Sequence, residues 1–278
     1  MNQVTVAIIG AAAGLSIFLG LPIARMRGLS TRAQGFLNAL ATGVLLFLLW
    51  DILSRANLPI DAALAQVHRD PGRWSSLAAL LVLFVGGLAG GLVLLTLVNQ
   101  RLGRRLRREA NPGPGAASLA AGSRAAPTAR ALALMIAIGL GLHNFSEGLA
   151  IGQSFAAGAL AFSTVLVIGF GLHNITEGFG IAAPLASSEG NPSWSFLALT
   201  GLIGGGPTLV GTVVGFNVVA PWSSVLFLAL AAGAVIYVIN EMLSVCRRMG
   251  TPIALSLGLL IGFTAGYATD LLLTYLGG

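Results

Sequence analysis

Long apolar runs, most of them close to twenty residues, occupy most of this sequence and are separated by polar connections. About twenty apolar residues in an α-helix span the hydrocarbon core of a bilayer, which is roughly 30 Å thick. Only 9% of the residues are charged and 56% are hydrophobic, whereas soluble domains carry about 25% charged residues. We therefore predict an all-α polytopic membrane protein with a single transmembrane domain over residues 1–278.

Eight of these runs are long enough to cross a membrane. Their approximate bounds are 4–24, 34–54, 75–98, 131–155, 159–185, 195–217, 223–245 and 253–276. Most connections are short, which makes successive helices antiparallel neighbours. Residues 55–74 form a longer connection of mixed charge, and residues 99–130 begin with a basic run and continue into Pro/Gly- and Ala/Ser-rich sequence. The second has the composition of a flexible loop. The first apolar run lacks a preceding basic segment, so we expect it to be a retained span and no cleaved signal.

The arginines predict the orientation in the membrane. The chain has no lysine, and twelve of its arginines lie in loops that follow odd-numbered spans, against three after even-numbered spans. By the positive-inside rule the odd-side loops, including the basic loop 99–130, are cytoplasmic and both termini lie outside the cytosol. The basic composition thus indicates topology and no nucleic-acid binding. Abundant Arg, Ala and Gly without Lys suggest a GC-rich bacterial genome, and hence the inner membrane.

One short motif, H-N-x-x-E-G, occurs twice, thirty residues apart, in the fourth and fifth spans. Residues four apart lie on one face of a helix, so His143 and Glu147 share a face, as do His173 and Glu177. Both copies lie near the middle of their spans, and a short turn near Gly158 makes the two helices antiparallel neighbours. Two imidazoles and two carboxylates at one depth are a plausible ligand set for a divalent metal.

The alternative is that each His–Glu pair is a salt bridge that joins the two helices. A charge at the bilayer centre costs at least about 2.5–3.5 kcal/mol, and apolar residues would pack there at lower cost. A bound metal neutralises the carboxylates and uses neutral imidazoles, so we favour a metal site. Asn144 and Asn174 follow the histidines. They suit a second, adjacent metal position, hydrogen bonds to the ligands, or hydrogen bonds between helices.

Three further acidic residues fall within spans. Asp51 and Asp270 lie near the outer ends of the second and eighth spans, and Glu241 lies in the inner half of the seventh. We expect Asp51 and Glu241 to be candidates for an ion pathway, with a weaker case for Asp270.

Together these features resemble the ZIP family of divalent-metal transporters, most closely its bacterial branch. The likeness rests on eight spans, the basic loop after the third, and the paired motif. It implies a 3+2+3 arrangement of helices and a metal site of His143, Glu147, His173 and Glu177, with Asn144 and Asn174 facing a second site. It also implies transport of zinc, often with iron, manganese, cobalt or cadmium, into the cytosol, with the metal as substrate and no cofactor. Family members are commonly dimers, so a homodimer is expected.

The sequence departs from the family pattern at several positions. Ser146 and Thr176 stand where the motif usually has proline; their hydroxyls could bond a backbone carbonyl one turn back or reach the metal. Gly206 stands where many members carry a glutamate before proline, which favours one bound metal over two. Phe47 replaces a histidine that often precedes the acidic residue of the second span.

The predicted mechanism takes a divalent ion past Asp51 to the His/Glu site and inward by way of Glu241. Because metal needs neutral imidazole, uptake should weaken below a pH of about 6.5. Two other functions remain open: a proton- or cation-coupled carrier of another solute, and an intramembrane metal-dependent hydrolase with a glutamate as base. The hydrolase lacks H-E-x-x-H and an evident nucleophile, and we expect no enzyme activity.

Overall fold

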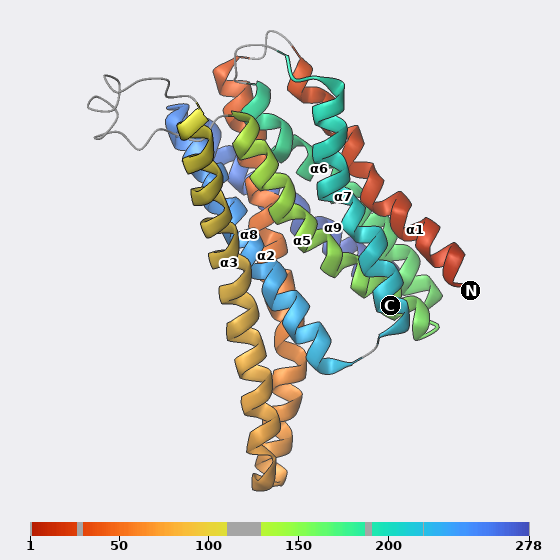
Figure 1. Ribbon diagram of the computed structural model, residues 1–278. Coiled ribbons are helices and arrows are strands. Elements are labelled where there is room, and N and C mark those ends of the chain that lie inside the picture. The colour runs from red at the N-terminus through yellow and green to blue at the C-terminus, as the bar shows by residue number, and fades with distance from the viewer. Residues whose placement is uncertain (1, 27–29, 110–128, 187–190, 219, 278) are drawn as a thin grey trace.

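The computed structural model describes residues 2–26, 30–109, 129–186, 191–218 and 220–277. Within these ranges the chain is helical and contains no strand (Figure 1). Eight helical segments among the described residues are long and apolar enough to cross a membrane. The prediction of an all-α polytopic membrane protein is therefore confirmed. The elements are α1 (Gln3–Leu15) with the 3-10 turns η1 (Ser16–Leu19) and η2 (Leu21–Arg25), α2 (Thr31–Arg69), η3 (Pro71–Arg73), α3 (Trp74–Glu109), α5 (Ala129–Ala156), α6 (Leu160–Ala186), α7 (Trp194–Asn217), α8 (Pro221–Arg248) and α9 (Pro252–Gly277).

Helix α5 lies at the centre of the bundle. It packs most extensively against α7 and also contacts α6 and α8, while α2 packs on α9 and α8, and α3 packs on α8. In the most apolar 18-residue stretch of α5, 72% of the residues are buried, against 17% in the corresponding stretches of α3 and α9. The helices alternate in direction, so both ends of the chain lie at the same end of the bundle (Figure 1). Helices α3 and α9 thus expose apolar faces suited to lipid, and α5 carries its polar motif inside.

Glycines bring α5 and α7 into backbone contact. A methyl group added at Gly148 would come 2.2 Å from the Thr208 carbonyl oxygen, and one at Gly211 would come 2.0 Å from that of Phe145. Small residues at helix interfaces allow this close approach in membranes.

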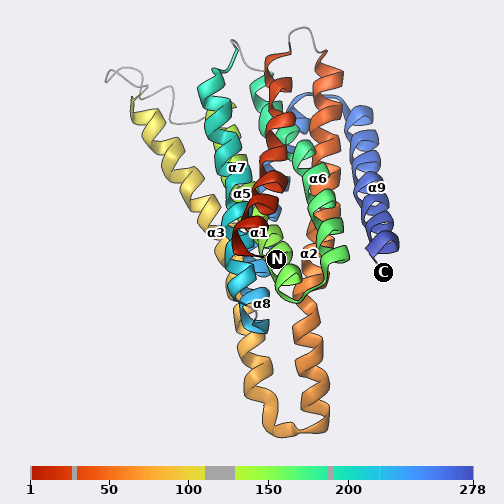
Figure 2. The same cartoon turned by 90° about the vertical axis from the view of Figure 1, so that its right-hand side faces the viewer.

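Residues 55–74 were expected to form a loop between two spans, but most of them are helical. The prediction of a loop is therefore wrong. Helix α2 continues to Arg69 over 39 residues, roughly 58 Å at 1.5 Å per residue. With α3 it forms a hairpin that projects beyond the other helices (Figure 2). Pairs one turn apart, such as Arg55 with Asp51 and Asn57 with Asp61, support the helix where the sequence becomes polar. Helix α3 also runs on to Glu109; residues 110–128 of the predicted basic loop lie outside the described residues.

The first span is not one continuous α-helix. After Leu15 the chain tightens into two 3-10 turns. The Ser16 hydroxyl contacts the carbonyl oxygens of Ala13 and of Gly171 in α6, both at 2.7 Å. Gly20 and Gly178 face each other where these turns cross α6, since a methyl group at Gly178 would meet the Ile17 carbonyl oxygen at 2.4 Å. The break therefore fixes the first span against one of the two helices that carry the motif.

Candidate metal-binding site

The doubled motif lies where α5 and α6 run side by side in opposite directions. The turn between them is closed by Gly158, whose φ of 76° suits glycine, and by a hydrogen bond from the Ala159 amide to the Ser154 carbonyl. His143 and His173 each lie fifteen residues along the chain from Gly158, one on each side of it, so the two copies of the motif meet. We call His143, Glu147, His173 and Glu177 the His–Glu cluster.

Short contacts join the four side chains of the His–Glu cluster. The Nε2 atom of His173 lies 2.7 Å from the Glu147 Oε1 atom, a hydrogen bond between α6 and α5. The Nε2 atom of His143 lies 3.3 Å from Glu147 Oε1 and 3.5 Å from Glu177 Oε1. The cluster is buried: the exposed fraction of the side chain is 13% for His173 and at most 3% for the other three residues.

The two asparagines donate hydrogen bonds from their amide groups to neighbouring helices. Asn144 Nδ2 donates to Glu177 Oε2 at 2.9 Å and to the Gly204 carbonyl of α7 at 3.1 Å. Asn174 Nδ2 donates to the Ala13 carbonyl of α1 at 3.0 Å. Both asparagines therefore join helices through their nitrogen atoms, and Asn144 also positions a cluster carboxylate. Their Oδ1 atoms have no hydrogen-bond partner in the described chain.

Unpaired polar atoms gather at this motif. Ten buried side-chain nitrogen and oxygen atoms lack a hydrogen-bond partner in the described residues, and six of them belong to the two motif copies. These six are His143 Nδ1 and Nε2, Asn144 Oδ1, Glu147 Oε2, Asn174 Oδ1 and Glu177 Oε1. Burying such an atom without a partner costs about 1–3 kcal/mol, and more when the group is charged. A cation bound among these atoms would remove much of that cost.

The cluster would need a small rearrangement to hold a metal. In the described part of the chain, no three His, Cys, Asp or Glu side chains already form a set of metal ligands. Donor atoms about 2.0–2.2 Å from a tetrahedral zinc lie roughly 3.4 Å apart. The two contacts of His143 match that separation. The hydrogen bond from His173 to Glu147 is shorter, so it would have to open by roughly 0.7 Å.

Ser146 and Thr176, the residues in place of the family's proline, both bond the backbone. Each hydroxyl donates at 2.7 Å to the carbonyl of the histidine three residues earlier, His143 or His173. Their hydrogens are therefore directed away from the cluster, and the bonds suit a mild local bend.

Gly206 does not face the cluster. A methyl group added there would meet nothing within 4 Å, whereas Gly204 faces Ile17 of η1 and Ile181 of α6 and supplies its carbonyl to Asn144. The residue of α7 that lies nearest the motif asparagine is thus Gly204.

A second group of charged residues lies close to His173. The single Nε–H of Arg55 is shared between the two carboxylate oxygens of Asp51, at 2.9 and 2.8 Å, and Arg55 Nη2 lies 3.8 Å from Asp270 Oδ1. These three residues and His173 line one pocket with about 40 Å³ of water-accessible space, which we call the His173 pocket. Its other lining residues are Phe47, Leu48, Leu166, Phe170, Gly266, Thr269 and Thr274.

The structure thus brings Asp51 and Asp270 together beside the cluster, and it leaves Glu241 apart. Glu241 is half-buried on α8 and does not line the His173 pocket. Sequence reasoning missed Arg55, which it assigned to a connection. The signal was available as an Asp and an Arg four residues apart, a spacing that places both on one helix face.

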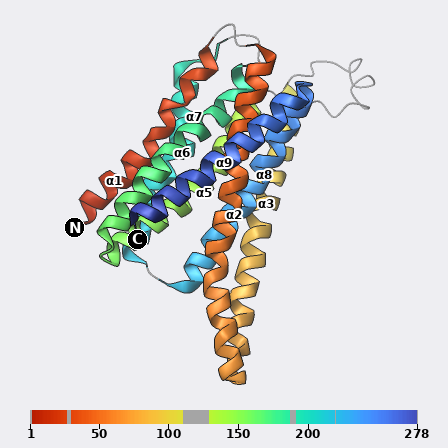
Figure 3. The ribbon, with the colours of Figure 1, turned by 180° about the vertical axis from the view of Figure 1, so that it is seen from behind.

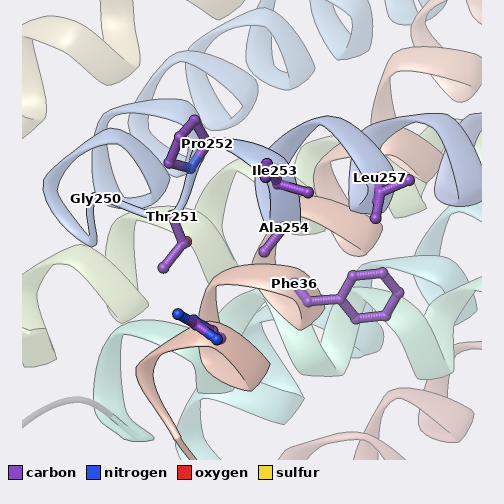
Figure 4. Close-up of a pocket in the computed structure, with 8 residues that line it drawn as sticks. Phe36, Gly250, Thr251, Pro252, Ile253, Ala254 and Leu257 are labelled. Carbon is purple, nitrogen blue, oxygen red and sulfur yellow. The ribbon is translucent and has the colours of Figure 1, made fainter.

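A larger pocket, of about 540 Å³, lies at the opposite end of α2, beside the connection from α8 to α9 (Figure 4). It is lined by Arg32, Phe36, Leu257 and residues 250–254, so its one ionisable side chain is a cation. Such a lining offers no carboxylate, imidazole or thiolate to a divalent metal.

In the described residues, eight membrane-length helices surround a buried set of imidazoles and carboxylates, which defines a polytopic membrane protein with a polar, ionisable core. The sequence matches the ZIP zinc transporter family over residues 99–273, more than half of the chain. The protein belongs to this family and is therefore a divalent-metal transporter. A comparison with curated proteins finds no significant match.

Proposed function

We propose that the protein carries zinc, and with less preference iron, manganese, cobalt or cadmium, into the cytosol through the His–Glu cluster. The observation that carries this proposal is the concentration of unpaired ligand atoms on the two motif copies. Imidazole nitrogen and carboxylate oxygen suit zinc and tolerate its neighbours among the divalent metals. The metal is the substrate, and the protein needs no cofactor.

The ion would reach the cluster from the side of the His173 pocket. His173 is the most exposed member of the cluster and the one that lines the pocket. Opening its 2.7 Å bond to Glu147 frees a nitrogen and an oxygen for the metal at one step. His143 and Glu177 would complete the shell, while Asn144 holds Glu177 in place. We further propose that the protein lies in a bacterial inner membrane with both termini outside, as a homodimer.

The proposal is tested by metal uptake into proteoliposomes that contain a zinc-sensitive dye. We expect His143→Ala and Glu177→Ala to lower the uptake rate by at least about tenfold, because each removes a ligand. His68→Ala is the matched control, since His68 is exposed near the end of α2, and should transport like the wild type. Wild-type rates in both cluster variants would rule out this site.

Zinc binding should also be measurable without transport. A ligand that binds only the folded protein raises its free energy of unfolding by about 2.7 kcal/mol at one hundred times its Kd. Zinc should therefore raise the Tm of the wild type in detergent, and a chelator should reverse the shift. Glu177→Ala should lose most of this shift, whereas His68→Ala should keep it. Direction is tested separately, by zinc accumulation in cells that express the protein.

A further inference from the structure

We propose that Arg55 is an electrostatic gate of the His173 pocket. By this we mean a tethered cation that occupies the carboxylates of Asp51 and Asp270 until an incoming divalent ion displaces it. The inference rests on the proposed function, and it assigns to Arg55 control over how readily the metal reaches the cluster.

Arg55 contacts two carboxylates, one from its own helix and one from α9. The guanidinium of Arg55 is bound through Nε to both oxygens of Asp51 and approaches Asp270 through Nη2. Asp51 and Arg55 belong to α2 and Asp270 to α9, and these helices cross in close contact (Figure 3). Arg55 therefore stands between two carboxylates from different helices, with a net charge of minus one for the three groups.

The ion pairs of Arg55 lie in the same pocket as His173 of the cluster. All three residues line the His173 pocket, and so does the imidazole of His173, which is bonded to Glu147. The side chains of Arg55, Asp270 and Asp51 are 32%, 28% and 18% exposed, against 13% for His173. Exposure therefore decreases from the ion pairs inward to the cluster, as expected if the ion pairs stand at the mouth.

The His173 pocket is too small for a fully hydrated divalent ion. Its 40 Å³, the space open to the centres of water molecules, holds about three or four waters at roughly 10–15 Å³ each, fewer than the roughly six around an octahedrally hydrated divalent ion. An ion can enter only if it loses water and the lining moves. The carboxylates of Asp51 and Asp270 are the groups in the mouth that can replace lost water, and Arg55 holds them in the described state. The arginine must release them before they can ligate the ion.

Packing next to the mouth joins α2 to α9 through contacts that do not involve Arg55. Phe47 and Trp50 of α2 contact Tyr267 of α9 with ring centroids 6.2 and 6.5 Å apart. The Phe47 ring also lies against Gly266 and Phe263. This aromatic contact joins α2 to α9 one turn from the ion pairs, so a neutral residue at position 55 should leave the helices packed.

The test compares Arg55→Gln, Arg55→Lys and Asp51→Asn with the wild type in zinc-uptake assays. Replacing Arg55 by glutamine changes the net charge of the mouth from minus one to minus two. We expect the KM for zinc to fall about three- to tenfold, the size expected for one charge acting across nearly aqueous surroundings. Asp51→Asn should raise the KM, and Arg55→Lys should stay near the wild type. The KM difference should shrink as ionic strength rises.

Arg73→Gln is the matched control. Arg73 pairs with Asp70 at 3.4 Å near the tip of the hairpin, where both side chains are more than half exposed and neither lines the pocket. Its removal should leave the KM unchanged. A KM for Arg55→Gln that equals or exceeds the wild-type value, with the protein folded, would overturn the gate and leave a structural ion pair.

A second measurement separates this inference from the proposed function. Thr269 lines the pocket, so Thr269→Cys in a Cys246→Ala background reports access to it. A cationic thiol reagent should react faster after Arg55→Gln, a neutral reagent at an unchanged rate, and neither should respond to Arg73→Gln. If zinc uptake is absent but this charge-dependent reactivity is seen, the proposed function fails and the gate remains. If uptake occurs but the reactivity does not change, the gate fails alone.

Discussion

At the scale of single residues, the two motif copies are alike in sequence but differ in their surroundings. His143 is fully enclosed and its Nε2 atom lies near both glutamates, whereas His173 borders a pocket and bonds one glutamate. The asparagines differ too: Asn144 holds Glu177, and Asn174 holds α1. The repeat therefore produces one asymmetric cluster, with a side that an ion can approach.

A prediction for Asn144 follows from its bond to the Glu177 carboxylate. Asn144→Ala should weaken zinc binding about ten- to a hundredfold, because residues that orient metal ligands typically contribute that much. Ser146→Ala should change it by less than about threefold, because the hydroxyl bonds a backbone carbonyl. Zinc titration of the purified variants measures both. A Ser146→Ala loss as large as that of Asn144→Ala would instead make the hydroxyl a metal ligand.

At the scale of helices, close glycine contacts fix the spans that carry the site. Gly178 follows the second motif glutamate on α6 and approaches the Ile17 carbonyl, so the α6 backbone is held against the first span. Gly206, on α7, meets open space. Substituting alanine at each position therefore tests whether backbone contact or helix propensity determines the free energy of unfolding.

We expect Gly178→Ala to lower the free energy of unfolding by about 1–3 kcal/mol, because the added methyl group forces α6 away from the first span. Gly206→Ala should be neutral or raise it by about 0.5–1 kcal/mol, since alanine is the better helix former and has room. Thermal unfolding in detergent compares them. Equal effects in both variants would contradict the role of the contact.

What the sequence could predict differs between the elements. Hydropathy located all eight spans, because apolar length reports membrane thickness directly. It misjudged residues 55–74, because hydropathy marks where the membrane ends, whereas a helix ends where its hydrogen bonds end. The motif histidines and glutamates could be paired because one short turn joins their helices. Asp270 could not be placed beside Asp51, because that contact depends on how α9 crosses α2.

At the scale of the whole molecule, the α2–α3 hairpin makes the two ends of the bundle unequal. It projects at the end that holds both termini, and the end of α6 and the start of α7 lie at the other end (Figure 1). The His173 pocket is lined by residues of α2, α6 and α9. The arginine distribution predicts that the hairpin end lies outside, and this topology would turn the mouth of the pocket toward the source of the metal.

Cysteine labelling in cells tests this orientation, in a Cys246→Ala background that removes the one native cysteine. Asp61 is exposed on the hairpin and Asn191 is exposed between α6 and α7, so the two are matched polar positions at opposite ends. A membrane-impermeant thiol reagent should label Asp61→Cys in intact cells and label Asn191→Cys only after the cells are opened, because the positive-inside rule predicts a cytosolic position for the face with the twelve odd-side arginines. The reverse labelling pattern would show that the protein has the opposite orientation in the membrane. The His173 pocket would then be an exit for metal, with zinc leaving past Asp51 and Arg55.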